Sequence, residues 1–388
     1  MPQRCVDVCF PSDLRSRTAA PCLPEFSAML GSNAVGNTVM NYVVRTLLPV
    51  FIALTVSAPA AAQTWAERLG YGAGKRVVIL HASGAGLCYE TNAAVEKALA
   101  DGSASSAAVM AACPWFEDFV AGAKLPADAD VGLTITLISD LARYRWTSVS
   151  PRGDVPGLID TDGYLRRGAA EFAFNTTPQE VGREIDAQLA KARASGLRPS
   201  HFTCHQGVVF ARADLAAIYL EAARRHWIPA VVIELTPERL REFQDQGLPV
   251  DDEMLHLVAN YPLPKIDDIR LVPRADSYEA KRDLFLKQLA ELPPGITQFV
   301  SRPAVDSPAL RRLSADAQQQ AWDAQLLGDA DVKKQLADAG IALTNWREIM
   351  RRFEGENPGA RPRETERPKE SQPRPGEEKP LDAPRGNP

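Results

Sequence analysis

Residues 75–99 read KRVVILHASGAGLCYETNAAVEKAL, and this stretch decides the fold class. A run of β-branched and aliphatic residues ends at His81, small residues follow, and an amphipathic pattern begins near Glu90. This order predicts a strand, a turn and a helix. In α/β folds, ligands and catalytic groups gather just past the carboxyl ends of such strands. The residues HASGAG are therefore the first place to look for chemistry.

Three familiar strand-turn-helix motifs do not match this turn. The dinucleotide fingerprint would accept Gly84 and Gly86, but its third glycine falls on Tyr89. The nucleophile elbow G-x-S-x-G, centred on Ser83, lacks both flanking glycines. A P-loop needs a Gly-Lys-Ser/Thr ending, which is absent.

The bulk composition is that of an ordinary globular protein. The chain has 388 residues, of which 45% are hydrophobic and 24% charged, and a net charge of −5. Because it has no Lys/Arg stripe interleaved with aromatic residues, we expect no nucleic-acid partner. Cys88, Cys113 and Cys204 have no metal-ligand spacing and are predicted to be buried free thiols.

Both ends of the chain are predicted to lie outside the folded domain. Residues 40–62 read MNYVVRTLLPVFIALTVSAPAAA, with a basic residue, a short apolar core and an A-x-A ending. This pattern predicts a secretory signal peptide, too short to span a membrane, and a periplasmic or extracellular protein. Residues 1–39 are then a doubtful leader. Residues 354–388, rich in Pro, Glu and Arg, are predicted to be disordered, which leaves one domain over 63–353.

Strand-like and helical runs alternate through this domain. Helices are expected near 90–101, from Pro114, over 178–196, 213–227 and 278–292, and strands in SSAAVMAA, ADVGLTITLI, PSHFTCHQG, AVVIEL, DDIRLV, GITQFVSRPA and IALTNWREIM. Thr176 or Thr177 caps the third helix. The alternation predicts a parallel sheet with helices outside, in a closed or distorted barrel or an open sheet, of which we favour the barrel. Residues 139–170 form a turn-rich excursion expected to cap one face.

The order of these motifs resembles the YdjC-like family, which includes the diacetylchitobiose deacetylases. The resemblance is carried by VVILHASGAGLCYETNAAV, SSAAVMAACPWFEDF, DVGLTITL, VPGLIDTDGYL, GLRPSHFTCHQG and LPPGITQFVSRPA, in the family's order. It implies a seven-stranded barrel related to the TIM barrel. It also implies a hydrolase that uses a divalent metal, zinc or magnesium, to remove acetyl groups from N-acetylated sugars.

The family's first strand ends in two aspartates, a general base and a metal ligand, and here these positions are Ser83 and Gly84. Serine is a poor proton acceptor near neutral pH, and glycine offers no ligand atom. The family's next ligand, a histidine in a GLHL strand, is Thr134 in GLTI. The resemblance thus leaves the base and two metal-ligand positions without their usual side chains.

Two further positions complete the site that the resemblance implies; we call the five positions together the carried-over positions. His205 keeps the ligating histidine, but the aspartate usual two residues earlier is Thr203. The histidine of the family's late His-Pro pair, a proton donor or oxyanion partner, is Arg302. A catalytic zinc needs about three protein ligands and an open position. We therefore expect metal binding to be lost or weak.

The favoured hypothesis is an exported carbohydrate-deacetylase homologue with impaired or lost catalysis that binds glycans. The alternative is an active metal-dependent hydrolase with a rebuilt site, using His81, His205 and Cys88 or Cys204. Acyl transfer by Ser83 with His205 as base is a further alternative. A third class, an envelope protein that binds partners through its tail, also remains open.

Several side chains have both a functional and a structural interpretation. Arg302 could bind a sugar carboxylate or phosphate, but a salt bridge with Asp306 is the default. DTDG at 160–163 resembles the start of a calcium loop, yet lacks the rest of that motif, so a turn suffices. The aromatic candidates for sugar stacking, which could equally pack a hydrophobic lid, are Trp115, Tyr144, Trp146 and Tyr164. Histidines 226 and 256 are expected to be structural or exposed.

Overall fold

The computed structural model describes residues 63–245 and 250–357. The predicted leader and signal peptide, and the predicted tail beyond residue 357, lie outside these ranges. The last helix continues to Glu356, three residues past the expected domain end at 353. Within the described ranges, no helix has the length and apolar character needed to cross a membrane.

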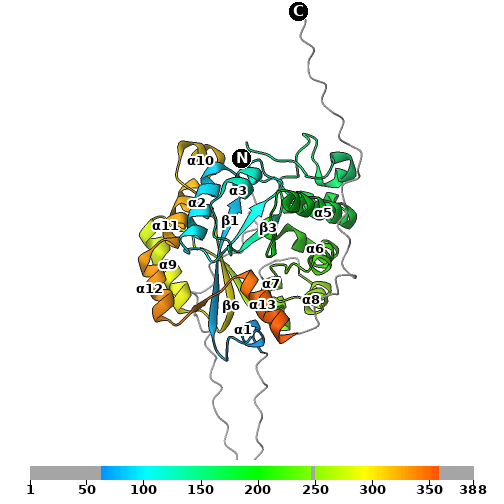
Figure 1. Ribbon diagram of the computed structural model, residues 1–388. Coiled ribbons are helices and arrows are strands. Elements are labelled where there is room, and N and C mark those ends of the chain that lie inside the picture. Colours follow the sequence, from blue (N-terminus) through cyan, green and yellow to red (C-terminus); the bar gives the residue numbers. More distant parts are fainter. Residues whose placement is uncertain (1–62, 246–249, 358–388) are drawn as a thin grey trace, which may run out of the picture. The chain divides into compact units, whose positions relative to one another are not determined.

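Strands and helices alternate along the domain as the sequence predicts (Figure 1). The strands are β1 Arg76–Ala85, β2 Ser106–Met110, β3 Val131–Ile135, β4 Phe202–Cys204, β5 Asp268–Leu271, β6 Gly295–Ser301 and β7 Ala342–Leu343. The α-helices are α1 Trp65–Arg68, α2 Tyr89–Ala100, α3 Phe116–Gly122, α4 Ala169–Asn175, α5 Pro178–Ala194, α6 Ala213–His226, α7 Pro237–Asp245, α8 Asp252–Ala259, α9 Tyr278–Ala290, α10 Pro308–Leu313, α11 Ala317–Leu327, α12 Ala330–Asp338 and α13 Trp346–Glu356. Three 3₁₀ segments are η1 Arg152–Asp154, η2 Pro156–Leu158 and η3 His205–Ala211.

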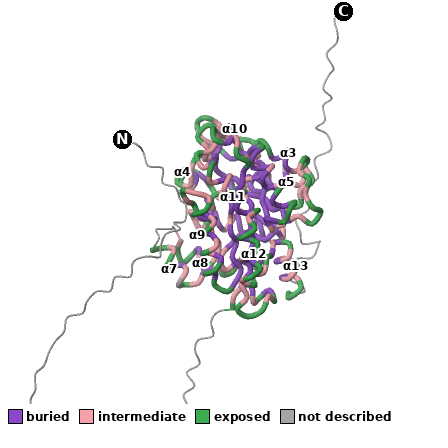
Figure 2. The backbone as a smooth tube through the Cα atoms, turned by 90° about the vertical axis from the view of Figure 1, so that its left-hand side faces the viewer, coloured by how far each residue is buried: buried purple, intermediate pink, exposed green. Residues whose placement is uncertain are grey.

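The strands form one parallel sheet in the order β4-β3-β2-β1-β6-β5, and the short β7 also pairs with β1. The first strand is therefore central, as expected for the apolar run that precedes His81. Helices α2, α9, α11 and α12 flank the curled sheet at the left of Figure 1, and α5, α6 and α8 flank it at the right. Buried residues fill the centre of the fold in Figure 2, and every residue of β2 and β3 is buried.

The seven strands curl into a half-barrel, which is consistent with the distorted barrel that we expected, although no ladder among the described residues joins β4 to β5 to close it in the manner of a TIM barrel. The predicted strand AVVIEL makes only single parallel bridges, from Ala230 to Phe202 and from Ile233 to Ile266. Both bridges carry regular backbone hydrogen bonds, because the N–H of Val231 donates to Phe202 and that of Glu234 donates to Ile266. The outcome is a curled parallel α/β sheet with β4 and β5 at the two ends of its strand order.

Local signals place the helices well. Thr177 caps α5 in a capping box with Glu180, Pro178 is the first helical residue, and Gly196 follows the end with φ +89°. This matches the prediction and selects Thr177, rather than Thr176, as the cap. The excursion over 139–170 contains η1, η2 and the start of α4.

The excursion over 139–170, which we call the lid, is held together by hydrogen bonds and an ion pair among its own residues. The N–H of Ser139 donates to the carbonyl of Arg166, and that of Leu165 to Trp146. Arg145 and Asp160 form an ion pair with side chains only 6% and 16% exposed. Asp160 also accepts the N–H groups of residues 162 and 164. DTDG is thus a turn that this ion pair anchors, as the simpler interpretation predicts.

A polar network lies inside the curl of the sheet. Asp130, just before β3, accepts the backbone N–H groups of Trp346 and Arg347 at the start of α13. The hydroxyls of Ser106 and Ser200 also hydrogen-bond to this carboxylate. The network therefore attaches the final helix to the amino ends of the strands.

Two buried imidazoles extend this network. His81 Nδ1 lies 3.0 Å from the Ser106 hydroxyl, and His201 Nδ1 lies 2.9 Å from that of Ser200. Their ring centroids are 5.4 Å apart, and the His201 ring also stacks on Trp346. Both Nε2 atoms are buried without a hydrogen-bond partner among the described residues. Burial lowers the pKa of each imidazole to about 3, so both rings are neutral at pH 7.

Candidate functional site

The carried-over positions meet at the carboxyl ends of β1, β3, β4 and β6. Thr134 is in register with Thr203 across β3 and β4, and Ala82 is in register with Ser301 across β1 and β6. Ser83 and Arg302 directly follow that second pair. We call this end of the sheet the mouth; it is where parallel α/β folds gather ligands.

The end of β1 is irregular. The pairing of β1 with β2 shifts register between Ala82 and Ala85. The Ser83 hydroxyl donates to the Ser301 carbonyl at 3.0 Å, which directs it toward β6. Gly84 has φ +94°, a backbone conformation that residues with a Cβ rarely adopt. At this ligand position, therefore, both the side chain and the backbone are unsuited to an aspartate.

Thr134 supplies a single buried hydroxyl to the mouth. The side chain is 5% exposed, and its Oγ1 has no hydrogen-bond partner among the described residues. A hydroxyl is a weak ligand for zinc compared with an imidazole. The position is thus inside the mouth, as predicted, with a much weaker donor than a histidine.

His205 is bound by a carboxylate that the sequence analysis missed. Its Nε2 lies 3.0 Å from Asp140 Oδ1, and Gln206 Nε2 donates to the other Asp140 oxygen at 2.5 Å. Asp140 follows β3 at the start of the lid, 65 residues away from His205 in sequence. An acidic residue just past a parallel strand was the available signal, but it did not reveal the partner.

The charges around Asp140 favour its ionised form. Burial alone would raise the pKa of this carboxyl, but the charge and hydrogen bond of His205, followed by the charge of Arg302, hold it below its ordinary value. Asp140 is therefore an anion at neutral pH that is bonded to His205 and lies within the electrostatic range of Arg302.

Arg302 is held in place by two aspartates, neither of which is the predicted partner. Its backbone N–H donates to Asp323 Oδ2 at 2.8 Å, and its guanidinium lies 3.0 Å from Asp316. The expected salt bridge with Asp306 is wrong, because Asp306 is bound by Arg311 five residues later. Asp306 lies just before α10 and is bonded to Arg311 on that helix, which leaves Arg302 to pair with Asp316.

The four predicted aromatic residues differ in exposure. Trp146 is buried, donates its indole N–H to Ile138, and packs 6.2 Å from the His205 ring. Tyr144 donates its hydroxyl to the Leu87 carbonyl. Tyr164 lies against the Arg145 guanidinium on the lid. Trp115 remains partly exposed beside the β1 turn. Burial leaves Trp146 no free face for a sugar, whereas Trp115 and Tyr164 keep exposed ring area.

The proposed rebuilt site is not assembled. His81 is buried and bonded to Ser106, below the mouth, and Cys88 and Cys113 are buried free thiols. Cys204 is a half-buried thiol. His226 bonds to Asp186, and His256 is exposed on α8, where a loop was expected. The remaining histidines and the thiols of the described ranges therefore add no ligand beside His205.

The side chains of the mouth do not fit a catalytic metal ion. Across residues 63–245 and 250–357, no three His, Cys, Asp or Glu side chains come together as a metal ion requires. His205 and Asp140 offer at most two donors, and they are hydrogen-bonded to each other. Zinc sites need about three protein ligands, so these two side chains are too few to hold a catalytic zinc ion.

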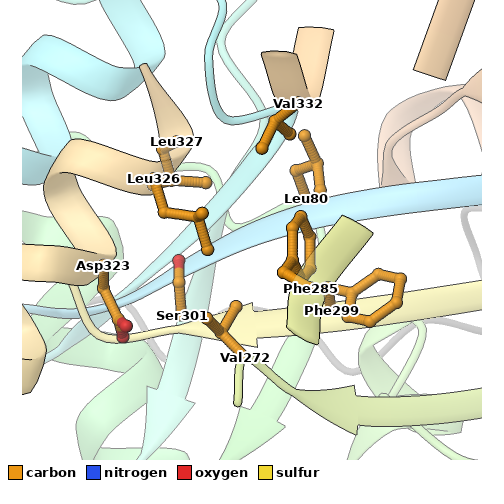
Figure 3. A pocket seen from close by; sticks show the side chains of 9 residues that line it. All are labelled: Leu80, Val272, Phe285, Phe299, Ser301, Asp323, Leu326, Leu327 and Val332. Atoms are coloured by element: carbon orange, nitrogen blue, oxygen red, sulfur yellow. The ribbon is translucent and has the colours of Figure 1, made fainter. Parts of the chain in front are cut away.

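A small cavity lies behind β6, between the sheet and helices α9, α11 and α12 (Figure 3). Its volume is about 10 Å³, at the lower limit for one water molecule. Its lining is mostly Leu, Phe and Val, with Ser301 and Asp323 as polar members. Both polar members contact residues of the mouth, because the Ser301 carbonyl accepts the Ser83 hydroxyl and Asp323 accepts the Arg302 N–H.

Comparison with known proteins gives a consistent result. A family model described as YdjC-like protein matches residues 77–338. A carbohydrate deacetylase of Thermus thermophilus is 31% identical over 73% of this chain and 97% of its own length. A carbohydrate deacetylase of Brevibacillus brevis is 25% identical over 70% of this chain and 99% of its own.

A solved structure supports the fold. A protein from Enterococcus faecalis described as a cellobiose-phosphate cleavage protein superposes with a TM-score of 0.59. It is 21% identical and covers 71% of this chain and 99% of its own. At this identity the likeness speaks for the fold alone.

Proposed function

The chain belongs to the YdjC-like family, with carbohydrate deacetylases among its relatives, and we propose that it binds glycans at the mouth without hydrolysing them. The observation that supports this proposal is the lack, among the described residues of the mouth, of the side chains that a catalytic metal ion would need. Ser83, Gly84 and Thr134 occupy the base and ligand positions, and no three metal-binding side chains gather among the described residues. A retained fold with altered chemistry supports recognition rather than metal-dependent deacetylation.

The residues of the mouth suit hydroxyl recognition. Asp140 is an acceptor, and Gln206 and the Arg302 guanidinium are donors. Sugar hydroxyls are themselves donors and acceptors, so this mixed set can bind them directly. Ser83 donates to a carbonyl and at neutral pH is no acceptor for the proton of an attacking water. The arrangement supplies hydrogen bonds but no general base at that position.

The first test is metal content. Residues 63–388 are loaded with zinc, desalted and measured by inductively coupled plasma mass spectrometry, beside the His205→Ala variant. We expect far less than one equivalent in both, because two mutually bonded side chains retain zinc poorly. The Thermus thermophilus relative, treated identically, controls for loading.

Near-stoichiometric zinc that disappears in His205→Ala would overturn the proposal and favour the active, rebuilt hydrolase. Acetate release from N-acetylated oligosaccharides, measured on the same samples, reports the same distinction independently of metal retention. Glycan affinity that persists in EDTA, with no acetate released, is the result that supports binding without hydrolysis.

We further propose that the protein is exported, on the strength of the apolar segment and A-x-A ending of residues 40–62. Expressed from Met40 in a Gram-negative host, the protein should be recovered from the periplasm with Gln63 at its amino terminus. Amino-terminal sequencing measures this directly. Recovery of an uncleaved cytoplasmic chain would contradict export, and a charged substitution in the apolar core, Leu54→Arg, is the matched control that should block processing.

A further inference from the structure

Two aromatic side chains stand exposed at the rim of the mouth. Tyr89 begins α2 and is 58% exposed, and Trp115 directly precedes α3 and is 36% exposed. Their ring centroids are 6.0 Å apart and their planes are inclined by 62°. We call these two rings the rim pair. Large apolar rings left open to solvent side by side are typical of interaction sites rather than of ordinary surface.

The rim pair is held by a buried amide. Asn92, in the first turn of α2, accepts the N–H of Gly86 at 2.6 Å and donates to the Trp115 carbonyl at 3.0 Å and to Asp118 at 2.9 Å. The N–H of Trp115 donates in turn to the Gly86 carbonyl. Asn92 is 4% exposed. These bonds fix the two helix starts to each other, so the rings are positioned before a ligand arrives.

The rim pair lies next to the polar residues of the mouth. Gly86, to which Trp115 is bonded, follows the Ser83 and Gly84 positions on the same turn. Tyr144, four residues after Asp140, donates its hydroxyl to Leu87 in the same turn. Burial, and to a smaller degree the charge of Asp140, raises the pKa of Cys113, two residues before Trp115. The rings and the Asp140–His205 pair therefore border one corner.

We propose that the rim pair is the stacking platform for an uncharged pyranose whose ring substituents are equatorial. Such a sugar presents axial C–H groups on both faces, which pack on an aromatic ring, while its hydroxyls point outward to hydrogen-bonding groups. Axial hydroxyls interrupt that apolar face. This inference rests on the proposed glycan binding and adds the residues and the sugar class that it selects.

The charges of the mouth favour an uncharged ligand. Arg302 is paired with Asp316, and Arg145 on the lid is paired with Asp160. Asp140 is an anion paired with His205, and it would repel a sugar carboxylate or phosphate. The other predicted aromatic residues contribute less, because Trp146 is buried and Tyr164 lies on Arg145.

Isothermal titration calorimetry with defined tetrasaccharides tests this platform. The probes are cellotetraose and chitotetraose, with equatorial substituents, and β-1,4-mannotetraose, with axial 2-hydroxyls. We expect the first two to bind and mannotetraose to bind at least about tenfold more weakly. Truncating a ring, in Tyr89→Ala or Trp115→Ala, is expected to weaken binding about tenfold, the usual scale for an aromatic anchor.

Controls separate the platform from the fold and from the proposed function. Leu343→Ala removes an exposed apolar side chain that pairs near the amino end of β1, and should leave affinity unchanged. Trp115→Phe keeps an aromatic face and should retain most of the binding. Melting temperatures of all variants confirm that Tyr89→Ala, which alters an exposed residue, is folded.

The outcomes are distinct. Binding that falls in Asp140→Ala but not in Tyr89→Ala or Trp115→Ala overturns the platform and leaves glycan binding intact. Equal affinity for mannotetraose and cellotetraose overturns the sugar class. No binding of any tetrasaccharide by the wild-type chain overturns both the platform and the proposed function.

Discussion

Acidification from pH 7 to pH 5 is expected to lower the free energy of unfolding by about 4 kcal/mol, about 2 kcal/mol for each of two buried histidines. His81 and His201 are 1% and 0% exposed, and burial lowers the pKa of each to about 3. Unfolded histidines titrate near 6.5, so below that pH the unfolded chain binds protons that the native rings do not. Stability is full above about pH 6.5 and is lost as pH falls toward 3.

Other groups affect this interval less. The carboxyls with lowered pKa, such as Asp140 and Asp101, titrate below the unfolded value near 4 and act at more acid pH. Burial raises the pKa of Asp130, Glu184, Asp267 and Asp323, so native protonation of these carboxyls works in the opposite direction as the pH falls. The loss between pH 7 and pH 5 therefore comes from the two imidazoles, and protonation of these carboxyls reduces it.

Urea denaturation at pH 7, 6 and 5 measures this loss. His201→Asn keeps an N–H near the Nδ1 position and should remove about half of the pH dependence, whatever its effect at pH 7. His256→Asn alters an exposed histidine on α8 and should leave the slope unchanged. A slope that is the same in wild type and His201→Asn would show that the buried ring does not control acid stability.

Gly132→Ala is expected to destabilise the protein by about 3 kcal/mol, the upper range for overpacking a core. A Cβ at position 132 would lie 2.5–2.6 Å from three atoms of the His201 ring. The ring cannot retreat easily, because it stacks on Trp346, which is fully buried and bonded to Gln298. The new methyl group must therefore displace the ring or the strand.

Chemical denaturation of four variants isolates this clash. In a His201→Ala background the obstructing ring is gone, so adding Gly132→Ala should cost less than about 1 kcal/mol more, a positive coupling of the two sites. Gly153→Ala is the matched control, since nothing lies within 4 Å of its Cβ position, and it should change stability by less than about 0.5 kcal/mol. Additive effects at positions 132 and 201 would contradict the steric account.

The elements with strong local signals could be predicted from sequence. The apolar run before His81 and the capping box at Thr177 are set by residues close together in the chain, and both are where expected. The segment predicted as a strand at 230–235 forms two separate parallel bridges rather than a continuous ladder, and its Ala230 N–H bonds to a hydroxyl 31 residues away, that of Tyr261. Local propensity does not report such competition for an N–H group.

The candidate site was predictable in position but not in pairing. Family motifs located Ser83, Thr134, His205 and Arg302 at the ends of strands that do meet. Their partners come from other segments. Asp140, the partner of His205, lies at the start of the lid, 65 residues away in the chain. Asp316, the partner of Arg302, directly precedes α11. Which carboxylate pairs with which cation depends on how those segments fold back over the sheet. Distances between segments so far apart in the chain cannot be read from a single sequence.

The central place of β1 in the sheet has a consequence for biosynthesis. One edge of β1 can pair with β2 soon after both emerge, but its other partners are β6 at residues 295–301 and β7 at 342–343. At about 5–20 residues per second, the ribosome needs roughly 10–40 s to reach β6. During that time an apolar strand edge is open to other nascent chains. Yield in a heterologous host should therefore respond to chaperone supply and to slower, cooler expression more than to codon choice within the first hundred residues.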